Sequence, residues 1–249
     1  IIVALCDAFP TEGDIVEAAC QVFRSGFTED EPGPFVFGLD VVVQFLLRAD
    51  YHTPRLGAVL GTACSLVTSR ISTSEGHGGL YSLMIWVTSL LQKLGEPSND
   101  PEIAQHGIDF LCRLMPTYVN IIIQQPSPSL EFLFMFALKA ITGSDPLPKF
   151  LAADFWSIFL TLKDLPEQTQ SAIDEILQSL GPLLAKALVL NIGGNASRSE
   201  LDKLCDPLKK LVARQVRAKS WLETALSDPS FPSQKVSSDE KRIFLQKLI

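Results

Sequence analysis

Apolar residues recur at intervals of three and four along nearly the whole chain, which is the period of an amphipathic α-helix. In PFVFGLDVVVQFLLRAD, the residues on one helical face are Val36, Leu39, Val42, Val43, Leu46 and Leu47. In TPRLGAVLGTACSLVTSR, they are Leu56, Val59, Leu60, Ala63, Leu66 and Val67. No stretch alternates with a period of two over a convincing length. The pattern therefore predicts an all-α chain.

Turn and capping residues divide this pattern into about ten to twelve helices. The stretch EPGP at 31–34 breaks the chain before one helix, and Pro34 suits its first turn. Asp100 followed by Pro101 is a typical helix start, with an N-cap residue before a proline. The segments expected to be helical further along the chain are 127–142, 145–162, 167–192, Ser197 to about Leu226, and a last one from about Ser237.

These helices are expected to form antiparallel pairs that repeat about every forty residues, the period of HEAT repeats. One pair has too narrow an apolar stripe to fold alone, so stacked pairs would bury a continuous core and leave a concave face. The predicted fold is an α-solenoid of HEAT repeats, a curved superhelical array in which residues 1–249 form one segment of about five to six helix pairs. A globular helical bundle is the alternative.

The stretch IGGNASRSELDKLCDPLKKLV raises the question of a phosphate-binding loop. A Walker loop needs the pattern G-x-x-x-x-G-K-[ST], but no Gly-Lys pair follows Gly193 and Gly194, and no strand precedes them. A turn between helices explains the residues better. Either glycine can take the left-handed conformation that ends a helix, and Ser197 with Glu200 forms a Ser-x-x-Glu capping box for the next one.

The helix after this turn carries two stripes. Its apolar stripe consists of Leu201, Leu204, Cys205, Leu208, Leu211 and Val212. Its basic stripe consists of Lys203, Lys210, Arg214 and Arg217. The basic stripe is either a cationic ridge that faces an acidic partner or simply a solvated face. Pro207 lies inside this helix and is expected to kink it.

The amino-acid composition excludes several classes of protein. Hydrophobic residues make up 47% of the chain and charged residues 20%, which is the composition of a folded protein. The net charge of −7 argues against general nucleic-acid binding. The five cysteines are scattered, which predicts reduced core residues of a cytosolic or nuclear protein. No apolar run approaches the roughly eighteen residues of a membrane span.

Catalytic and metal-binding patterns are not evident. His52, His77 and His106 have no partner at metal-ligand spacing. The stretch GHGG at 76–79 resembles an oxyanion-hole motif, but no G-x-S-x-G nucleophile motif accompanies it, so a loop is expected. The acidic groups at 29–31, 174–175 and 239–240 lack the spacing of a magnesium site and are expected on solvated loops or helix faces, with contact to basic cargo as the alternative. The sequence thus predicts no enzyme, no cofactor and no metal site.

The phenylalanines of EFLFMFALKAI (131–141) are expected in the core, because aromatic residues at helical spacing are usually buried there. The alternative is a groove for Phe-Gly repeats.

Three segments resemble a known family: IDFLCRLMPTYV, GGNASRSELDKLCDPLKKLV and SWLETALSDPSFPSQKVSSDEKRIFLQKLI. Together they resemble the C-terminal part of importin-β-type nuclear transport receptors (karyopherin-β), in the branch of importin-thirteen and transportin-SR. The resemblance is most specific at 193–199 and 221–233. The chain starts at Ile1 in the middle of a helical pattern, so the N-terminal half of the receptor is expected to be absent from it.

The resemblance implies a HEAT solenoid that binds protein cargo on its concave face and exchanges it under the control of Ran-GTP, which binds mainly to N-terminal repeats. It also implies contacts with nucleoporin Phe-Gly repeats, a monomeric receptor, and shuttling between nucleus and cytoplasm. Neither membrane insertion nor direct nucleic-acid binding is expected. The alternative function is a HEAT scaffold subunit of a constitutive complex unrelated to Ran.

The family pattern also implies candidate cargo-binding residues, because the second helix of each pair is expected to face inward. The candidates are Arg55, Glu131, Asp174, Glu175, Lys203, Lys210 and Arg214. The basic stripe is sparser than the arginine-rich helix with which transportin-SR binds serine-arginine cargo. This difference favours the importin-thirteen-like side of the branch.

Overall fold

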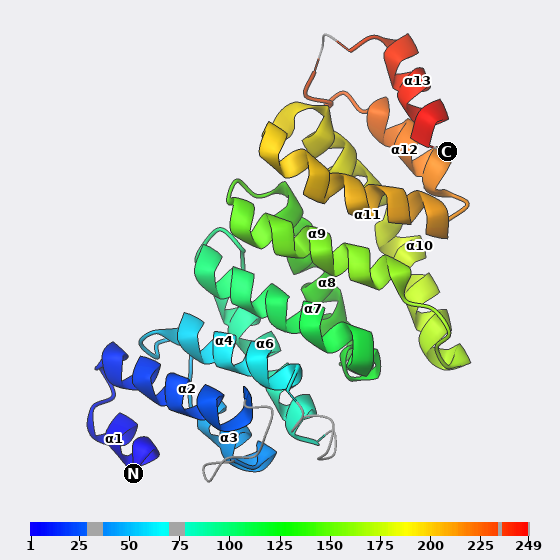
Figure 1. The fold of residues 1–249 in the computed structure, drawn as a ribbon. Coiled ribbons are helices and arrows are strands. Elements are labelled where there is room, and N and C mark those ends of the chain that lie inside the picture. Colours follow the sequence, from blue (N-terminus) through cyan, green and yellow to red (C-terminus); the bar gives the residue numbers. More distant parts are fainter. Residues whose placement is uncertain (29–36, 70–77, 234–235, 249) are drawn as a thin grey trace. The chain divides into compact units, whose positions relative to one another are not determined.

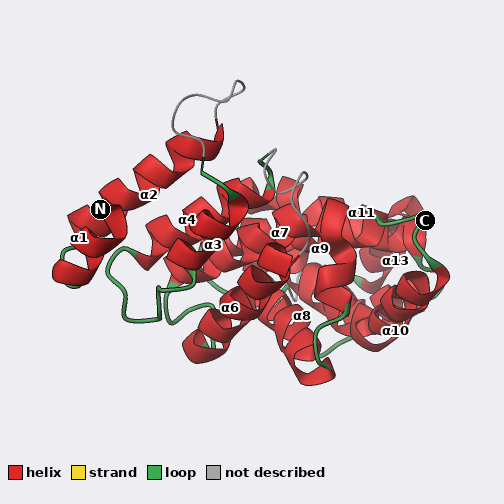
Figure 2. Ribbon diagram, turned by 90° about the horizontal axis from the view of Figure 1, so that it is seen from below, coloured by secondary structure: helices red, strands yellow, loops and turns green. Residues whose placement is uncertain are grey.

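The fold is all-α, as predicted, and its helix pairs have the arrangement of a helical solenoid (Figures 1 and 2). The ranges described by the computed structural model are 1–28, 37–69, 78–233 and 236–248. Within these ranges the regular elements are helices, and no strand is present. The chain forms two compact units, Ile1–Leu133 and Phe134–Ile249, which are considered separately below.

The first unit contains helices in two layers. Its helices are α1 (Ile2–Ala8), α2 (Gly13–Thr28), α3 (Leu39–Leu46), α4 (Leu56–Val67), α6 (Gly78–Leu94), α7 (Pro101–Ile123) and the first part of α8 (Ser127–Thr142). Helices α2, α4 and α7 pack side by side in one layer, and α3 packs against α6 in the other. Each layer is thus built from alternate helices, as expected for stacked antiparallel pairs.

Local signals fix the ends of several helices in this unit. The side chain of Asp100 accepts hydrogen bonds from the backbone N–H groups of Glu102 and Ile103, both at 3.1 Å, which confirms the predicted N-cap of α7. Helix α6 buries most of its apolar residues, and the indole N–H of Trp86 donates to the carbonyl of Ala49 at 2.7 Å. The predicted break at 31–34, with Pro34, lies outside the described residues.

The second unit repeats the two-layer arrangement. Its helices are the rest of α8, α9 (Pro146–Thr161), α10 (Glu167–Leu190), η1 (Asn191–Asn195), η2 (Arg198–Glu200), α11 (Leu201–Arg214), α12 (Ala218–Leu226) and α13 (Ser238–Leu248). Helix α9 packs against α11 in one layer, and α10 packs against α12 in the other.

An aromatic cluster forms the centre of the second unit. Phe134 of α8 contacts Phe155, Trp156 and Phe159 of α9 at centroid distances of 4.8 to 5.5 Å. These edge-to-face contacts are the arrangement that aromatic rings prefer. Phe134 and Phe136 are both buried, which confirms that the phenylalanine-rich segment contributes to the core.

The prediction of one continuous helix from Ser197 to about Leu226 is wrong, because the helix is interrupted. Helix α11 ends at Arg214, Gln215 is extended (φ −118°, ψ 117°), and α12 starts at Ala218. The physical reason is the tertiary packing of the two helices. Helix α11 packs on α9 whereas α12 packs on α10, so the chain must cross from one layer to the other. Pro207 does not end α11, which continues through it as one helix.

One helical stretch in the described part, Glu167–Asn195, has the length and mean hydropathy of a membrane-spanning segment, contrary to the expectation from the sequence. Its residues Ile173, Leu177, Leu184 and Leu188 are completely buried within the folded unit. Core helices commonly have such a composition, and the packing of α10 against α12 accounts for it here.

Candidate protein-binding surface

The turn that precedes α11 has the structure predicted from its sequence. Gly194 has a φ of +145°, a conformation that favours glycine. The carboxylate of Glu200 accepts the backbone N–H of Ser197 at 2.6 Å, and the Ser197 side chain accepts the backbone N–H of Glu200 in return. The capping box is therefore confirmed. The segment is a turn between helices, as predicted from its lack of a Walker pattern.

The same carboxylate makes a contact that the sequence did not predict. Glu200 forms an ion pair with Lys149 of α9 at 2.7 Å, and the two residues are only 7% and 3% exposed. Hydrogen bonds from Lys149 and then Ser197 lower the pKa of Glu200 to about 2. The signal in the sequence is Lys149, a lysine within the mostly apolar stretch PLPKFLAADFWSIF. This buried pair fixes the start of α11 against α9.

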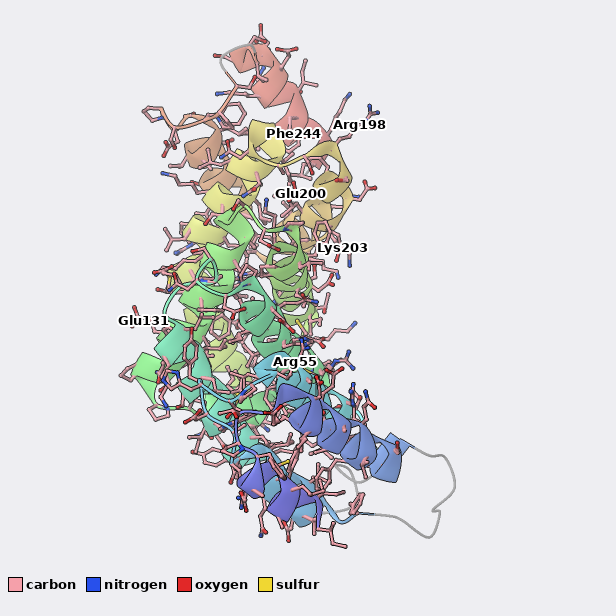
Figure 3. All side chains as sticks on the ribbon, turned by 90° about the vertical axis from the view of Figure 1, so that its left-hand side faces the viewer. Arg55, Glu131, Arg198, Glu200, Lys203 and Phe244 are labelled. Atoms are coloured by element: carbon pink, nitrogen blue, oxygen red, sulfur yellow. The ribbon has the colours of Figure 1, made fainter. Side chains whose placement is uncertain are left out.

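Two basic residues of the predicted stripe on α11 form ion pairs within the unit; Lys203 is exposed and Lys210 is half-buried. Lys203 donates to both carboxylate oxygens of Asp154 at 3.0 Å, which joins α11 to α9. Lys210 pairs with Asp206 one turn earlier at 2.7 Å. Figure 3 shows Lys203 projecting from the surface and Glu200 lying against the ribbon. Arg217, the fourth member of the predicted stripe, is exposed.

Arg214 brings two of the predicted residues together. Its guanidinium group lies 3.5 Å from the carboxylate of Asp174 on α10 and donates a hydrogen bond to the carbonyl of Leu162. Asp174 also accepts a hydrogen bond from Gln170 at 3.0 Å. This cluster joins both layers of the unit at the C-terminal end of α11.

Three residues of the predicted basic stripe, Lys203, Lys210 and Arg214, are therefore paired with acidic side chains, so the stripe is not a bare cationic ridge. Ion pairs between exposed side chains contribute about 0 to 1 kcal/mol each to stability. Such pairs cost little to break, so a charged partner could exchange them for contacts of its own.

The remaining candidates occupy other helices. Arg55 precedes α4 with a left-handed backbone (φ 55°), and it lies 3.7 Å from Glu17 and 4.0 Å from Asp14 of α2. Glu131 of α8 and Glu175 of α10 are exposed. Within the first unit, Arg55 and Glu131 lie on opposite sides of the ribbon in Figure 3.

The candidates consequently do not share one face. In the second unit, Asp174 and Glu175 belong to the layer of α10, whereas the basic residues belong to the layer of α11. The candidates of this unit therefore lie on both helices of the pairs, and which helix faces inward stays a prediction. The reason is that the assignment of inner and outer helices depends on where a pair starts, which periodicity does not define.

The described part of the structure contains no metal cluster. None of the five cysteines forms a disulfide, and burial raises the pKa of the Cys64 thiol well above its ordinary value. No group of three or more histidine, cysteine or acidic residues among the described positions could hold a metal ion. His77, the first half of the GHGG stretch and the acidic group at 29–31 lie outside the described residues, and Gly78 and Gly79 begin α6.

Comparison with known proteins finds relatives that match nearly the whole chain. No family model matches the chain. The chain is 29% identical to the importin beta-like protein kap111 of Schizosaccharomyces pombe over 95% of its length. It is 24% identical to rat importin-13 and 35% identical to bovine importin-13, in each case over 96% of its length. It spans 24% of the length of each of these relatives and matches their C-terminal part.

Proposed function

We propose that the chain is a protein-binding segment of an importin-β-type nuclear transport receptor of the importin-13 branch. The main support for this proposal is the similarity to kap111 and importin-13 over 95 to 96% of the chain. The helical architecture supports it, because stacked helix pairs bind proteins along their exposed faces and need no covalent chemistry.

The exposed charge pairs suggest how cargo would bind. Lys203 with Asp154 and Lys210 with Asp206 present both signs of charge on adjacent positions of one layer. A cargo surface with complementary charges would replace these weak internal pairs, which favours specificity and fast association. We therefore propose the seven candidate residues as cargo contacts, with the α11 residues as the most coherent group.

Control by Ran-GTP and passage through nuclear pores belong to the whole receptor in this proposal. In a solenoid, each repeat contacts only its neighbours, so small angular changes can add up along the array. A ligand that binds one array shape better than another shifts the shape available to a second ligand. Ran-GTP would act in this way on cargo affinity, and Phe-Gly repeats of nucleoporins would be transient partners of a monomeric, shuttling receptor.

The experiment is the capture of partners from cell extract by the full-length protein, with and without Ran locked in its GTP form. We expect a defined set of proteins to leave, or to appear, when Ran-GTP is added. A partner set that does not respond to Ran-GTP would instead indicate a constitutive scaffold.

A further inference from the structure

A cationic stretch joins the second half of α11 to the start of α12. Residues 207–222 contain five basic residues and no acidic residue, in a chain whose net charge is −7. Asp206 and Glu223 bound the stretch at its two ends. The basic residues are Lys209, Lys210, Arg214, Arg217 and Lys219. The stretch therefore forms a local positive field on a protein that is acidic as a whole.

Three of these five cations have no acidic partner. Lys210 and Arg214 pair with acidic side chains of the unit, as described above. Lys209, Arg217 and Lys219 are exposed, and no acidic side chain in the described ranges forms an ion pair with them. A ligand can therefore bind these three charges without breaking an internal pair.

A turn fixed by backbone hydrogen bonds lies at the centre of the stretch, where the chain passes from α11 to α12 (Figure 1). The Gln215 N–H donates to the Leu211 carbonyl at 2.9 Å, and the Ala218 N–H donates to the Gln215 carbonyl at 3.0 Å. Val216 and Arg217 occupy the two central positions of this turn, and Val216 is 99% exposed. Because the turn is already ordered, binding to it costs little conformational entropy.

The start of α12 is held in place by Trp221. An added Cβ on Gly181 of α10 would lie 2.3 Å from the Trp221 ring, so this ring rests directly on α10. It is the one aromatic ring of residues 207–222, so the stretch has no aromatic surface on which a nucleic-acid base could stack. The exposed apolar group is instead the aliphatic side chain of Val216, which suits an apolar side chain of a protein.

We propose that this surface, made of Lys209, Val216, Arg217 and Lys219, binds an acidic segment of a partner protein that carries an apolar residue beside its acidic run. The carboxylates pair with the three unpaired cations, and the apolar residue packs on Val216. Lys209 precedes the turn by about 9 Å along the helix, so an extended acidic run of about four residues reaches from it to the turn. The inference rests on the proposed function, since it assigns the acidic segment to the cargo.

The test uses the full-length protein and a fluorescein-labelled peptide of about five glutamates with a terminal leucine amide. Fluorescence anisotropy measures the Kd in about 0.1 M salt. The double variant Arg217→Glu/Lys219→Glu is expected to weaken binding about tenfold, because attraction becomes repulsion at two positions. Val216→Ser is expected to weaken binding about threefold, and to have no effect on a peptide with serine in place of the leucine.

Arg198→Glu is the matched control for the charge reversal. Arg198 is exposed and lies before the first residue of α11, so the 14 residues of that helix place it about 20 Å from the turn. This distance exceeds the screening length of about 10 Å, so the Kd should change less than about twofold. Circular dichroism of each variant verifies that the helical fold is intact.

Three results would overturn the proposal. The first is equal affinity of the native protein and the Arg217→Glu/Lys219→Glu variant. The second is an equal loss of affinity in Arg198→Glu, because only the net charge would then matter. The third is a single-stranded oligonucleotide that displaces the labelled peptide more strongly than the unlabelled peptide does, which would indicate a nucleic-acid ligand.

The peptide assay contains neither Ran nor nuclear pores, so its outcome is separate from that of the proposed function. Partner capture that ignores Ran-GTP, together with normal peptide binding, would refute the transport role alone. Partner capture that responds to Ran-GTP, together with no peptide binding, would refute this surface alone.

Discussion

The buried ion pair between Lys149 and Glu200 gives the sharpest stability prediction. The two side chains are 2.7 Å apart and almost fully buried. Glu200→Gln leaves the ammonium group of Lys149 buried without an opposite charge. Breaking a buried pair in this way costs about 3 to 5 kcal/mol, much more than the loss of an exposed pair.

The lowered pKa of Glu200 gives a second value for the contribution of the ion pair to stability. It also predicts how this contribution depends on pH. The partners Lys149 and Ser197 lower this pKa from 4.5 to about 2, which corresponds to about 3 kcal/mol. Because the folded-state pKa is depressed, this stabilisation is present above pH 4.5 and is lost as the pH falls toward 2. We expect the stability gap between the native chain and Glu200→Gln to be full at pH 7 and to shrink through that window.

The assay is urea unfolding of the chain and its variants, followed by tryptophan fluorescence and circular dichroism. The double variant Lys149→Met/Glu200→Leu removes both charges and replaces them with apolar groups. We expect it to be more stable than Glu200→Gln, because no unpaired charge remains buried. Asp206→Asn is the control, since it breaks a partly exposed pair with Lys210 and should cost less than about 1 kcal/mol.

Two results would refute this reasoning. One is a Glu200→Gln variant within about 1 kcal/mol of the native chain at pH 7, the cost expected of an exposed pair. The other is a stability gap that stays constant from pH 7 to pH 2, because the protonation of Glu200 would then not be coupled to folding.

Three further predictions concern packing, capping and binding. Gly181→Ala places a Cβ against the ring of Trp221, so we expect a loss of about 1 to 3 kcal/mol in urea unfolding. Asp100→Ala removes the N-cap of α7 and should cost about 1 kcal/mol, measured in the same way. Lys203→Glu replaces the exposed pair with Asp154 by two like charges at the surface, so stability should fall by about 1 kcal/mol or less. Affinity for a captured partner, measured by calorimetry, should nevertheless fall, and unchanged affinity would remove Lys203 from the proposed cargo surface.

Features that depend on neighbouring residues in the chain could be predicted from the sequence. The N-cap at Asp100 and the capping box of Ser197 and Glu200 each involve residues within a few positions of one another. The burial of Phe134 and Phe136 follows from helical periodicity and hydrophobicity. These signals are local, so no knowledge of the packing was needed.

Features set by packing between helices could not be predicted in this way. The pairing of Lys149 with Glu200 requires knowing that α9 and α11 are neighbours. The break at Gln215 arises because α12 changes layer, which the continuous helical pattern does not reveal. The sequence alone does not reveal that Lys203 of α11 is paired, because its partner Asp154 comes from another helix.

The most direct test of the central claim is a transport assay in permeabilised cells. A partner captured by the full-length protein is labelled, and its passage across the nuclear envelope is followed with and without that protein and a Ran-GTP gradient. We predict passage that requires both components. A partner that stays bound but never crosses, or that crosses equally well without the protein, would contradict a role as a nuclear transport receptor.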